Sequence, residues 1–251
     1  MKVALFVPCY VDQFYPQVGI ATLQLLEKLD VEVDVPPAQT CCGQPMANAG
    51  FSDLSNGCHR HFLNVFASYQ TIVSPSGSCV LHLREHLSEI HHDSSDEPPR
   101  ILELCEFLTD IVDVKSLNAK FPYKVGFHNS CHAQRGLNLS QMSELVAPDF
   151  SKPRRLLNMV EGINLISLQR PDECCGFGGT FCVSEEAVSV RMGEDRIADH
   201  INNDAAFITG TDMSCLMHLD GLLRRQGSST RVIHLAEILN NESDDVINPK
   251  K

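Results

Sequence analysis

The sequence has no long hydrophobic run and carries little positive charge. Its longest apolar stretches are of strand length, such as VALFVP at 3–8, and none approaches the ~20 apolar residues that a membrane-spanning helix needs. Lysine and arginine number 20 against 32 aspartates and glutamates, so the formal net charge is −12. Because nucleic-acid binding depends on clustered basic side chains, this balance argues against it. We therefore expect a protein that neither spans a membrane nor binds nucleic acid.

Cysteine is abundant, but the common C-x-x-C spacing is missing. The chain has 11 cysteines in 251 residues. We expect a cytoplasmic protein without a secretory signal, because the short apolar run at the N-terminus lacks a small-residue cleavage site. Stable disulfides are rare in a reducing compartment, so recurring cysteines indicate metal or redox chemistry. The missing C-x-x-C spacing argues against paired zinc knuckles.

The sequence contains an internal duplication, because several segments recur in the same order. The matching pairs are KVALFVPC (2–9) with KVGFHNSC (124–131), TCCGQP (40–45) with ECCGFG (173–178), TIVSPSGSCVLHL (71–83) with AFITGTDMSCLMHL (206–219), and RILELCEFL (100–108) with RVIHLAEIL (231–239). We expect the first repeat at 1–115 and the second at 116–251. The charged, proline-rich stretch 91–99 or residues 118–122 would form the boundary, and the C-terminal residues after about 240 would form a loose tail.

Each repeat alternates β-branched runs with helical periodicity, which is typical of βαβ units. Strands are predicted at 2–8, 31–35, 71–75, 124–129, 163–168 and 206–210. Helices are predicted at 16–29, 52–68 and 185–202. The predicted fold class is therefore α/β, with two pseudo-symmetric repeats that each hold a mostly parallel sheet flanked by helices.

Four cysteines of each repeat follow the predicted strands. They are Cys9, Cys41, Cys42 and Cys79 in the first repeat, and Cys131, Cys174, Cys175 and Cys215 in the second. Loops at the carboxyl ends of parallel strands open on one edge of the sheet, where α/β folds bind ligands. The four thiols of each repeat should therefore meet, and the two edges should face one another across a pseudo-twofold axis. Cys58, Cys105 and Cys182 have no counterpart, so we expect them to be buried or incidentally exposed.

Thiols gathered in this way have three chemical interpretations. Thiolates select zinc, copper(I) or iron–sulfur clusters over hard ions. From the residues alone, a structural zinc site, a redox dithiol that uses the adjacent cysteines and an iron–sulfur cluster all remain open. Gly43 and Gly176 follow the two doublets. Without a Cβ they allow close backbone approach, and amides in such loops can point at anionic sulfur.

The order of cysteine, Cys-Cys-Gly and cysteine resembles the cysteine-rich CCG domain. This domain occurs twice in the catalytic subunit of heterodisulfide reductase and in related iron–sulfur oxidoreductase subunits. PCYVDQFYP (8–16) and DECCGFGGTF (172–181) are similar to signature stretches of the family members that serve L-lactate utilization. The resemblance covers nearly the whole chain. It implies electron transfer in the oxidation of L-lactate to pyruvate, together with companion lactate-utilization subunits that include a ferredoxin-like iron–sulfur protein.

The same resemblance implies the ligands. It assigns an iron–sulfur cluster, [4Fe-4S] in the simplest case and one or two per chain, to the two sets of four cysteines. The chain departs from fuller family members, which carry C-x-x-C near the third strand of each repeat. Ser76 and Asp212 stand where the first cysteine of that pair would be, as oxygen ligands or as spacers. Each repeat thus offers four thiolates where the heterodisulfide reductase subunit offers five.

Other residues near the cysteines are weaker candidates. His82 and His218 each follow a repeated cysteine by three positions, and could donate to sulfur, relay protons or be ordinary helix histidines. His132 and Arg135 are the only local pair resembling a base with a carboxylate-binding arginine, so they are the catalytic candidates. The alternative to an oxidoreductase subunit is a zinc-stabilised or metal-free module whose cysteines scaffold a subunit interface, or a thiol–disulfide oxidoreductase.

Overall fold

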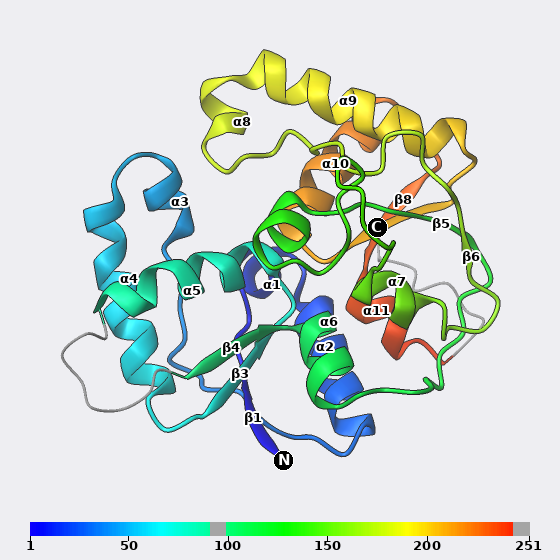
Figure 1. The fold of residues 1–251 in the computed structure, drawn as a ribbon. Coiled ribbons are helices and arrows are strands. Elements are labelled where there is room, and N and C mark those ends of the chain that lie inside the picture. Colours follow the sequence, from blue (N-terminus) through cyan, green and yellow to red (C-terminus); the bar gives the residue numbers. More distant parts are fainter. Residues whose placement is uncertain (91–98, 243–251) are drawn as a thin grey trace.

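The computed structural model describes residues 1–90 and 99–242. The boundary expected at 91–99 and the tail expected near the C-terminus therefore lie almost wholly outside the described residues. The described chain forms two halves of the same topology (Figure 1). Within it, no helix is both long enough and apolar enough to cross a membrane.

The two halves contain closely similar successions of strands and helices. The first half comprises β1 (Lys2–Leu5), α1 (Cys9–Phe14), α2 (Pro16–Lys28), β2 (Glu32–Asp34), α3 (Gln44–Asn48), α4 (Ser52–Phe66), β3 (Thr71–Ser74), α5 (Gly77–Ile90), β4 (Arg100–Glu103), α6 (Leu104–Glu106) and the π-helical turn η2 (Phe107–Ile111). The second comprises β5 (Lys124–Phe127), the π-helical turn η3 (His132–Gly136), α7 (Lys152–Leu157), β6 (Asn164–Leu165), α8 (Phe181–Ser184), α9 (Glu186–Asn202), β7 (Phe207–Gly210), α10 (Met213–Arg225), β8 (Arg231–His234) and α11 (Leu235–Asn240).

Both sheets are parallel and have equivalent strand orders, β2-β1-β3-β4 and β6-β5-β7-β8. The α/β class with two pseudo-symmetric repeats is thus confirmed. β1 pairs with β3 through Ala4 and Ile72, and β5 pairs with β7 through Val125 and Phe207. In such an order, the chain turns in opposite directions from the two central strands. This leaves a crevice at their carboxyl ends, where ligands of α/β proteins bind.

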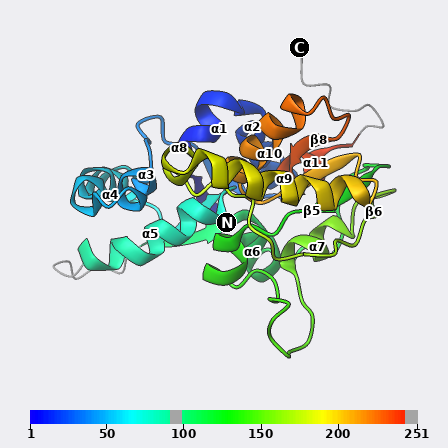
Figure 2. The same cartoon turned by 90° about the horizontal axis from the view of Figure 1, so that it is seen from above.

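The helices form three layers around the two sheets (Figure 1). α4 and α5 cover the outer face of the first sheet, and α9 and α10 cover the outer face of the second. Between the sheets lie α2, α6, α7 and α11. In Figure 2, α4 and α5 lie at one side of the molecule, and α7 and β6 lie at the opposite side.

The middle layer belongs to both halves. Its apolar cluster joins Val3 and Leu102 of the first sheet to Val125 and Phe207 of the second. The helix that follows the last strand of each half packs against the other half. α11 of the second half packs against α2 of the first, and α6 of the first half packs against α7 of the second. The halves therefore share a middle core, in addition to the apolar clusters buried beneath the outer helices of each sheet.

A second exchange occurs beside the cysteines. α1, which begins at Cys9, packs against α10 of the second half, and η3, which follows Cys131, packs against α5 of the first. Gly77 marks the closeness of the second contact, since a Cβ on it would lie 2.8 Å from the Cβ of Ala133. Each half thus fixes part of the other half's cysteine site.

Candidate metal centre

The structure brings the four repeated cysteines of the first half together. The Cys9 Sγ lies 3.8 Å from the Cys41 Sγ, and the Cys42 Sγ lies 3.5 Å from the Cys79 Sγ. Cys9 begins α1 after β1, the doublet lies in the loop before α3, and Cys79 lies in the first turn of α5. Three loops at the carboxyl edge of the sheet therefore meet in one thiol quartet, which we call the first quartet.

The second quartet has the same arrangement. Interaction with the Cys174 thiol raises the pKa of Cys131, and the Cys215 Sγ lies within 4.8 Å of the Cys175 Sγ. Burial is also repeated: the second cysteine of each doublet is buried, at 2% exposure for Cys42 and 3% for Cys175, whereas the first is half-buried. The two quartets therefore occupy equivalent positions in the fold and show the same pattern of burial.

Each doublet is followed by a glycine in the left-handed region, with φ of +94° at Gly43 and +86° at Gly176. The turn aims backbone N–H groups at sulfur: Gly43 N–H donates to Cys41 Sγ at 3.4 Å, and Gly176 N–H donates to Cys174 Sγ at 3.4 Å. The Gly176 turn is also tightly packed, because a Cβ there would lie 2.5 Å from the Ser189 carbonyl oxygen of α9. Backbone amides directed at sulfur stabilise its anionic form.

The thiols of each quartet differ in acidity. Hydrogen bonds from the Cys42 and Cys9 thiols lower the pKa of Cys41, and those from Cys131 and Cys175 lower the pKa of Cys174. The hydrogen bond to Cys41 in turn raises the pKa of Cys42, which burial raises further. The first thiol of each doublet is thus the one held as thiolate, the form that binds metals.

Both quartets open on one cavity of about 90 Å³ between the halves. All the repeated cysteines except Cys41 line it, together with Tyr10, Gln44, Phe177 and His132. The prediction that the two cysteine edges face each other therefore agrees with this arrangement.

Ser76 and Asp212 occupy equivalent positions in the two repeats, and they contact each other beside the cavity. The Ser76 hydroxyl donates to Asp212 Oδ1 at 2.9 Å, the Ser78 N–H donates to the same oxygen at 3.0 Å, and the Ser130 hydroxyl donates to Oδ2. All of these groups are buried. Asp212 therefore links the first quartet's helix to the loop before Cys131.

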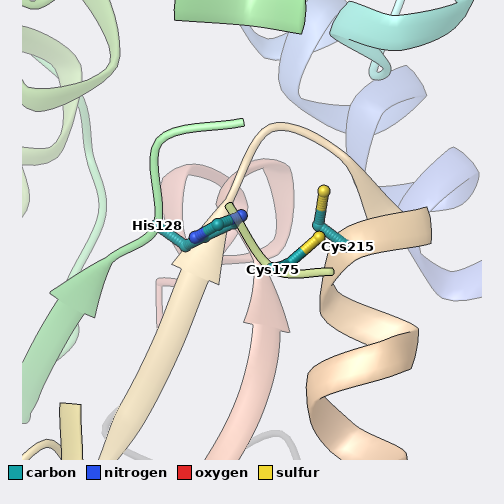
Figure 3. Close-up of side chains that lie close together, drawn as sticks. All are labelled: His128, Cys175 and Cys215. Atoms are coloured by element: carbon teal, nitrogen blue, oxygen red, sulfur yellow. The ribbon is translucent and has the colours of Figure 1, made fainter. Parts of the chain in front are cut away.

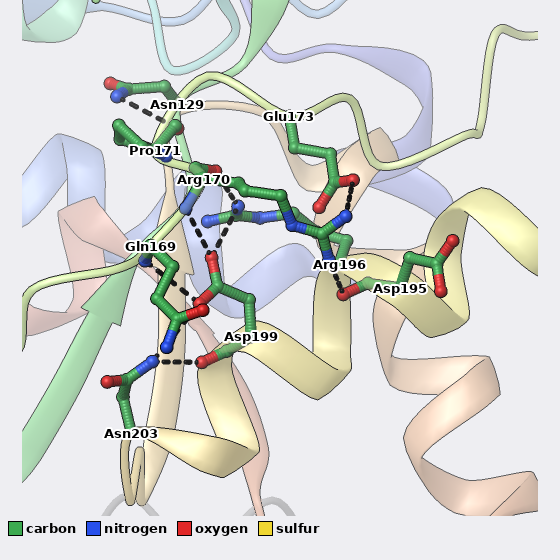
Figure 4. Close-up of polar contacts among 9 residues, drawn as sticks. All are labelled: Asn129, Gln169, Arg170, Pro171, Glu173, Asp195, Arg196, Asp199 and Asn203. Carbon is green, nitrogen blue, oxygen red and sulfur yellow. Dashed lines mark hydrogen bonds and ion pairs between the residues drawn. The ribbon is translucent and has the colours of Figure 1, made fainter.

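A buried ion pair on α9 positions the segment that leads to the second doublet (Figure 4). Asp199 accepts hydrogen bonds from the N–H groups of Gln169 and Arg170, both at 3.0 Å, and lies 3.5 Å from Arg196 Nη1. Arg196 is fully buried and also donates to the Arg170 carbonyl oxygen. Burial lowers the pKa of Arg196. The loop before Cys174 is therefore fixed by hydrogen bonds to charged groups inside the protein.

The histidines singled out in the sequence have different surroundings. His82 is buried, and its Nε2 lies 2.9 Å from His59 Nε2; burial and the neighbouring His86 and His59 lower its pKa to about 4. His218 Nε2 donates to the Ser189 carbonyl oxygen at 3.3 Å. Both side chains are therefore held by local contacts.

The two catalytic candidates are separated by the structure. His132 lines the cavity, with Nδ1 3.7 Å from Cys131 Sγ and Nε2 3.4 Å from Gln44 Nε2. Arg135 is exposed, does not line the cavity and forms an ion pair with Glu144 at 2.6 Å. The pair therefore does not converge on a common point beside the thiols.

The cysteines without counterparts stay outside the quartets. Cys105 is fully buried in the shared core. Cys58 lies on α4, and Cys182 donates from its thiol to the Gly179 carbonyl oxygen at 3.0 Å. None of the three lines the cavity.

His128 is a site residue that sequence reasoning did not single out. It follows β5, is 1% exposed, and lies beside Cys175 and Cys215 (Figure 3). Burial, together with the charge of Arg196, lowers the pKa of His128 to about 3, so its ring is neutral. The available signal was the repeat itself, since His128 stands where the first copy has Phe6.

The donor sets suit a soft metal or a metal cluster. Each quartet offers four sulfur ligands from three loops, with one thiol already favoured as thiolate and backbone amides beside it. Buried, closely spaced thiols of this kind can bind a metal cluster.

Comparisons with known proteins agree with the duplicated site. The family profile described as a cysteine-rich domain (CCG) matches residues 3–84 and 125–220. The chain is 38% identical over 247 residues to lactate utilization protein A of Exiguobacterium sp., covering 95% of this chain and 97% of that protein. It is 37% identical over 246 residues to the protein of the same name from Geobacillus kaustophilus, covering 96% and 99%.

Among solved structures, the aspartate racemase of Picrophilus torridus aligns with 96% of this chain and 91% of its own, at 11% identity and a TM-score of 0.37. The two family matches cover the first three strands of each sheet and include all eight cysteines of the quartets. The chain belongs to the cysteine-rich CCG domain family.

Proposed function

We propose that this protein is an oxidoreductase subunit that transfers electrons during the oxidation of L-lactate to pyruvate, through iron–sulfur chemistry held by its cysteine quartets. A four-thiolate [4Fe-4S] cluster in one or both halves is the simplest form. The observation that carries the proposal is the convergence of both quartets on one cavity. Relatives named lactate utilization protein A, similar over nearly the full length, support the assignment to lactate utilization.

A bound iron–sulfur cluster would supply a one-electron donor and acceptor. The chain's own groups would hold it and adjust its charge. The first cysteine of each doublet offers a thiolate, and the Gly43 and Gly176 amides direct N–H groups at that sulfur. Hydrogen bonds to ligand sulfur disperse its negative charge, and they favour the reduced state of such centres.

The proposed partners are companion subunits of a lactate-utilization system, including a ferredoxin-like iron–sulfur protein. His132 is the cavity residue nearest to a catalytic role, because its ring faces the same space as the thiols. Arg135 would have to leave Glu144 to contribute. Substrate oxidation would therefore depend on groups that the companion subunits bring.

The first test is the metal content of anaerobically purified protein. We expect iron and acid-labile sulfide in near-equal amounts and an EPR signal that changes on reduction with dithionite. Cys42→Ser and Cys175→Ser each remove a buried ligand from one quartet, so each should lower the iron content, and together they should abolish it. Cys58→Ser is the matched control, because Cys58 lies near the first doublet but outside the quartet. Equal iron loss in the control would contradict the ligand assignment.

One observation keeps a zinc site as a second candidate. A tetrahedral ion with zinc–sulfur bonds of about 2.3 Å sets its sulfur ligands about 3.8 Å apart. The Sγ–Sγ distances of 3.8 Å for Cys9–Cys41 and 3.5 Å for Cys42–Cys79 are close to this value. The four ligands of a cubane point outward from separate irons and lie further apart, so the thiols would have to open. Zinc without sulfide in the purified protein would favour a scaffolding module over electron transfer.

A further inference from the structure

We propose that His128 is a nitrogen ligand of the metal centre in the second half, where one ring nitrogen joins the thiolates of Cys175 and Cys215. This inference rests on the proposed function in one respect, because it takes the second quartet to be a metal site. It adds that the two halves use different ligand sets. The first half uses sulfur alone, and the second uses sulfur with imidazole.

The geometry supports a common ion. The potential ligand atoms of His128, Cys175 and Cys215 all lie within 4.8 Å of one another, and all three residues are buried. Figure 3 shows the imidazole extending from the end of β5 toward Cys175, whose sulfur faces the Cys215 side chain. Metal–nitrogen bonds of about 2.0–2.1 Å and metal–sulfur bonds of about 2.3 Å place tetrahedral ligands about 3.5–3.8 Å apart. Small side-chain rotations would therefore bring all three atoms onto one tetrahedral ion, whereas in a cubane cluster each of them would bind a separate iron.

The imidazole has no other evident role. Within the described chain neither ring nitrogen of His128 has a hydrogen-bond partner, although the side chain is 1% exposed. A buried polar atom left unpaired costs about 1–3 kcal/mol, so native structures pair nearly all of them. Arg196, His200 and Cys174 are its other titratable neighbours, and none of them hydrogen-bonds to it. The unpaired nitrogens and the adjacent thiols complement each other as metal ligands.

In the first half, the equivalent position serves only core packing. Phe6, the equivalent of His128, makes edge-to-face contacts with Phe62 and Phe66 at centroid distances of 5.2 and 5.9 Å. A hydrocarbon therefore satisfies this position when core packing is the only requirement. A buried histidine is costlier than phenylalanine unless its nitrogens are used. The replacement thus indicates a function specific to the second half.

With four terminal positions on a [4Fe-4S] cluster, His128 would take the place of one thiolate of the second quartet. An imidazole in that place would make the centre less negative and would raise its reduction potential, as in centres that carry two histidine ligands. The second centre would then accept electrons more readily than the first. Two centres of unequal potential beside one cavity would give electron flow a direction.

Pulsed EPR on protein carrying [15N]histidine tests the ligand directly. The protein is reconstituted anaerobically with iron and sulfide, in a Cys42→Ser background that weakens the first quartet, and then reduced. We expect a histidine-nitrogen coupling to the paramagnetic centre. His128→Phe should abolish the coupling and shift the centre to a lower potential, whereas His218→Gln should retain it, because His218 Nε2 is engaged by the Ser189 carbonyl.

The labelled protein with His128 intact gives the primary result, so the test does not depend on folding of the variant. Circular dichroism checks the variant separately. Iron and sulfide without histidine coupling, or coupling that persists in His128→Phe, overturns the inference and leaves the proposed function standing. Zinc without sulfide overturns the proposed function. X-ray absorption at that zinc then decides on His128: nitrogen lost in His128→Phe supports ligation, and a shell of sulfur alone overturns it.

Discussion

Two glycines allow the cysteine doublets to turn back toward their own sulfur atoms. At Gly43 and Gly176, the left-handed backbone directs an N–H group at the first sulfur of the doublet. The two turns differ in their surroundings. A Cβ on Gly43 would have its nearest contact at 3.1 Å, whereas one on Gly176 would lie 2.5 Å from a backbone oxygen of α9. Replacement should therefore be costlier in the second half.

We expect Gly176→Ala to destabilise the protein more than Gly50→Ala. Gly50 has a similar φ of +85° but no atom within 4 Å of its Cβ position, so it isolates the backbone penalty of about 1–2 kcal/mol. Gly176→Ala adds the overlap with the Ser189 carbonyl. Denaturant unfolding of both variants measures the difference. Equal losses of unfolding free energy would show that close approach to α9 is not the constraint.

The segments that close the two sheets are equivalent elements with different caps. After β4, the Glu103 carboxylate accepts from the Cys105 N–H at 2.6 Å; after β8, His234 Nδ1 accepts from the Ala236 N–H at 3.1 Å. Glu237 completes the second cap by accepting from the His234 N–H at 3.0 Å. Burial raises the pKa of Glu103 to about 8 and that of Glu237 to about 7. These helix starts therefore titrate near neutral pH.

Glu237→Gln should change the pH dependence of stability. Unfolded glutamate loses its proton near pH 4.3, so between about pH 4.3 and 7 the folded state binds more protons than the unfolded one. Wild-type stability contributed by this group therefore falls as pH rises through that window. The variant keeps an acceptor oxygen without titrating, and its relative stability should rise by up to about 3 kcal/mol by pH 8. Urea unfolding at pH 5 and pH 8 measures it. A pH-independent difference between the variant and the wild type would contradict the assignment.

The elements that the sequence predicted best are those with long or repeated apolar patterns. The strands placed at 71–75 and 206–210 correspond to β3 and β7, and the helix placed at 52–68 corresponds to α4. β4 and β8 were not predicted, because each is a four-residue run that passes directly into a helix and shows one continuous apolar pattern.

Contacts between the halves could not be read from the repeat. Sequence comparison gives Ser76 and Asp212 equivalent positions, but not their hydrogen bond, which depends on how the two sheets face each other. The proximity of His128 to Cys175 has the same cause, because three separate loops fix it. From the sequence alone, a histidine at the end of an apolar run is interpreted as a core residue. Its position beside the cysteines becomes visible only in the three-dimensional structure.

At the scale of the whole molecule, the shared middle layer should make each half depend on the other. Fragments 1–115 and 116–251 would each expose the apolar faces of that layer. We expect either fragment alone to lack cooperative unfolding, and the two together to form a stable complex. Circular dichroism and size-exclusion chromatography of the separate and mixed fragments test this. Cooperative unfolding of fragment 1–115 by itself would contradict the shared core.

The contact between Ser76 and Asp212 lies where a homodimer of one repeat would place a residue against its own copy, because an isologous interface is self-complementary. Two aspartates there would repel unless they shared a proton, and two serines would supply no charge. Fusing the copies into one chain removes the requirement for self-complementarity. A single carboxylate can then face a hydroxyl. The fused protein thereby acquires two different halves, an asymmetry that a dimer of identical subunits could not have.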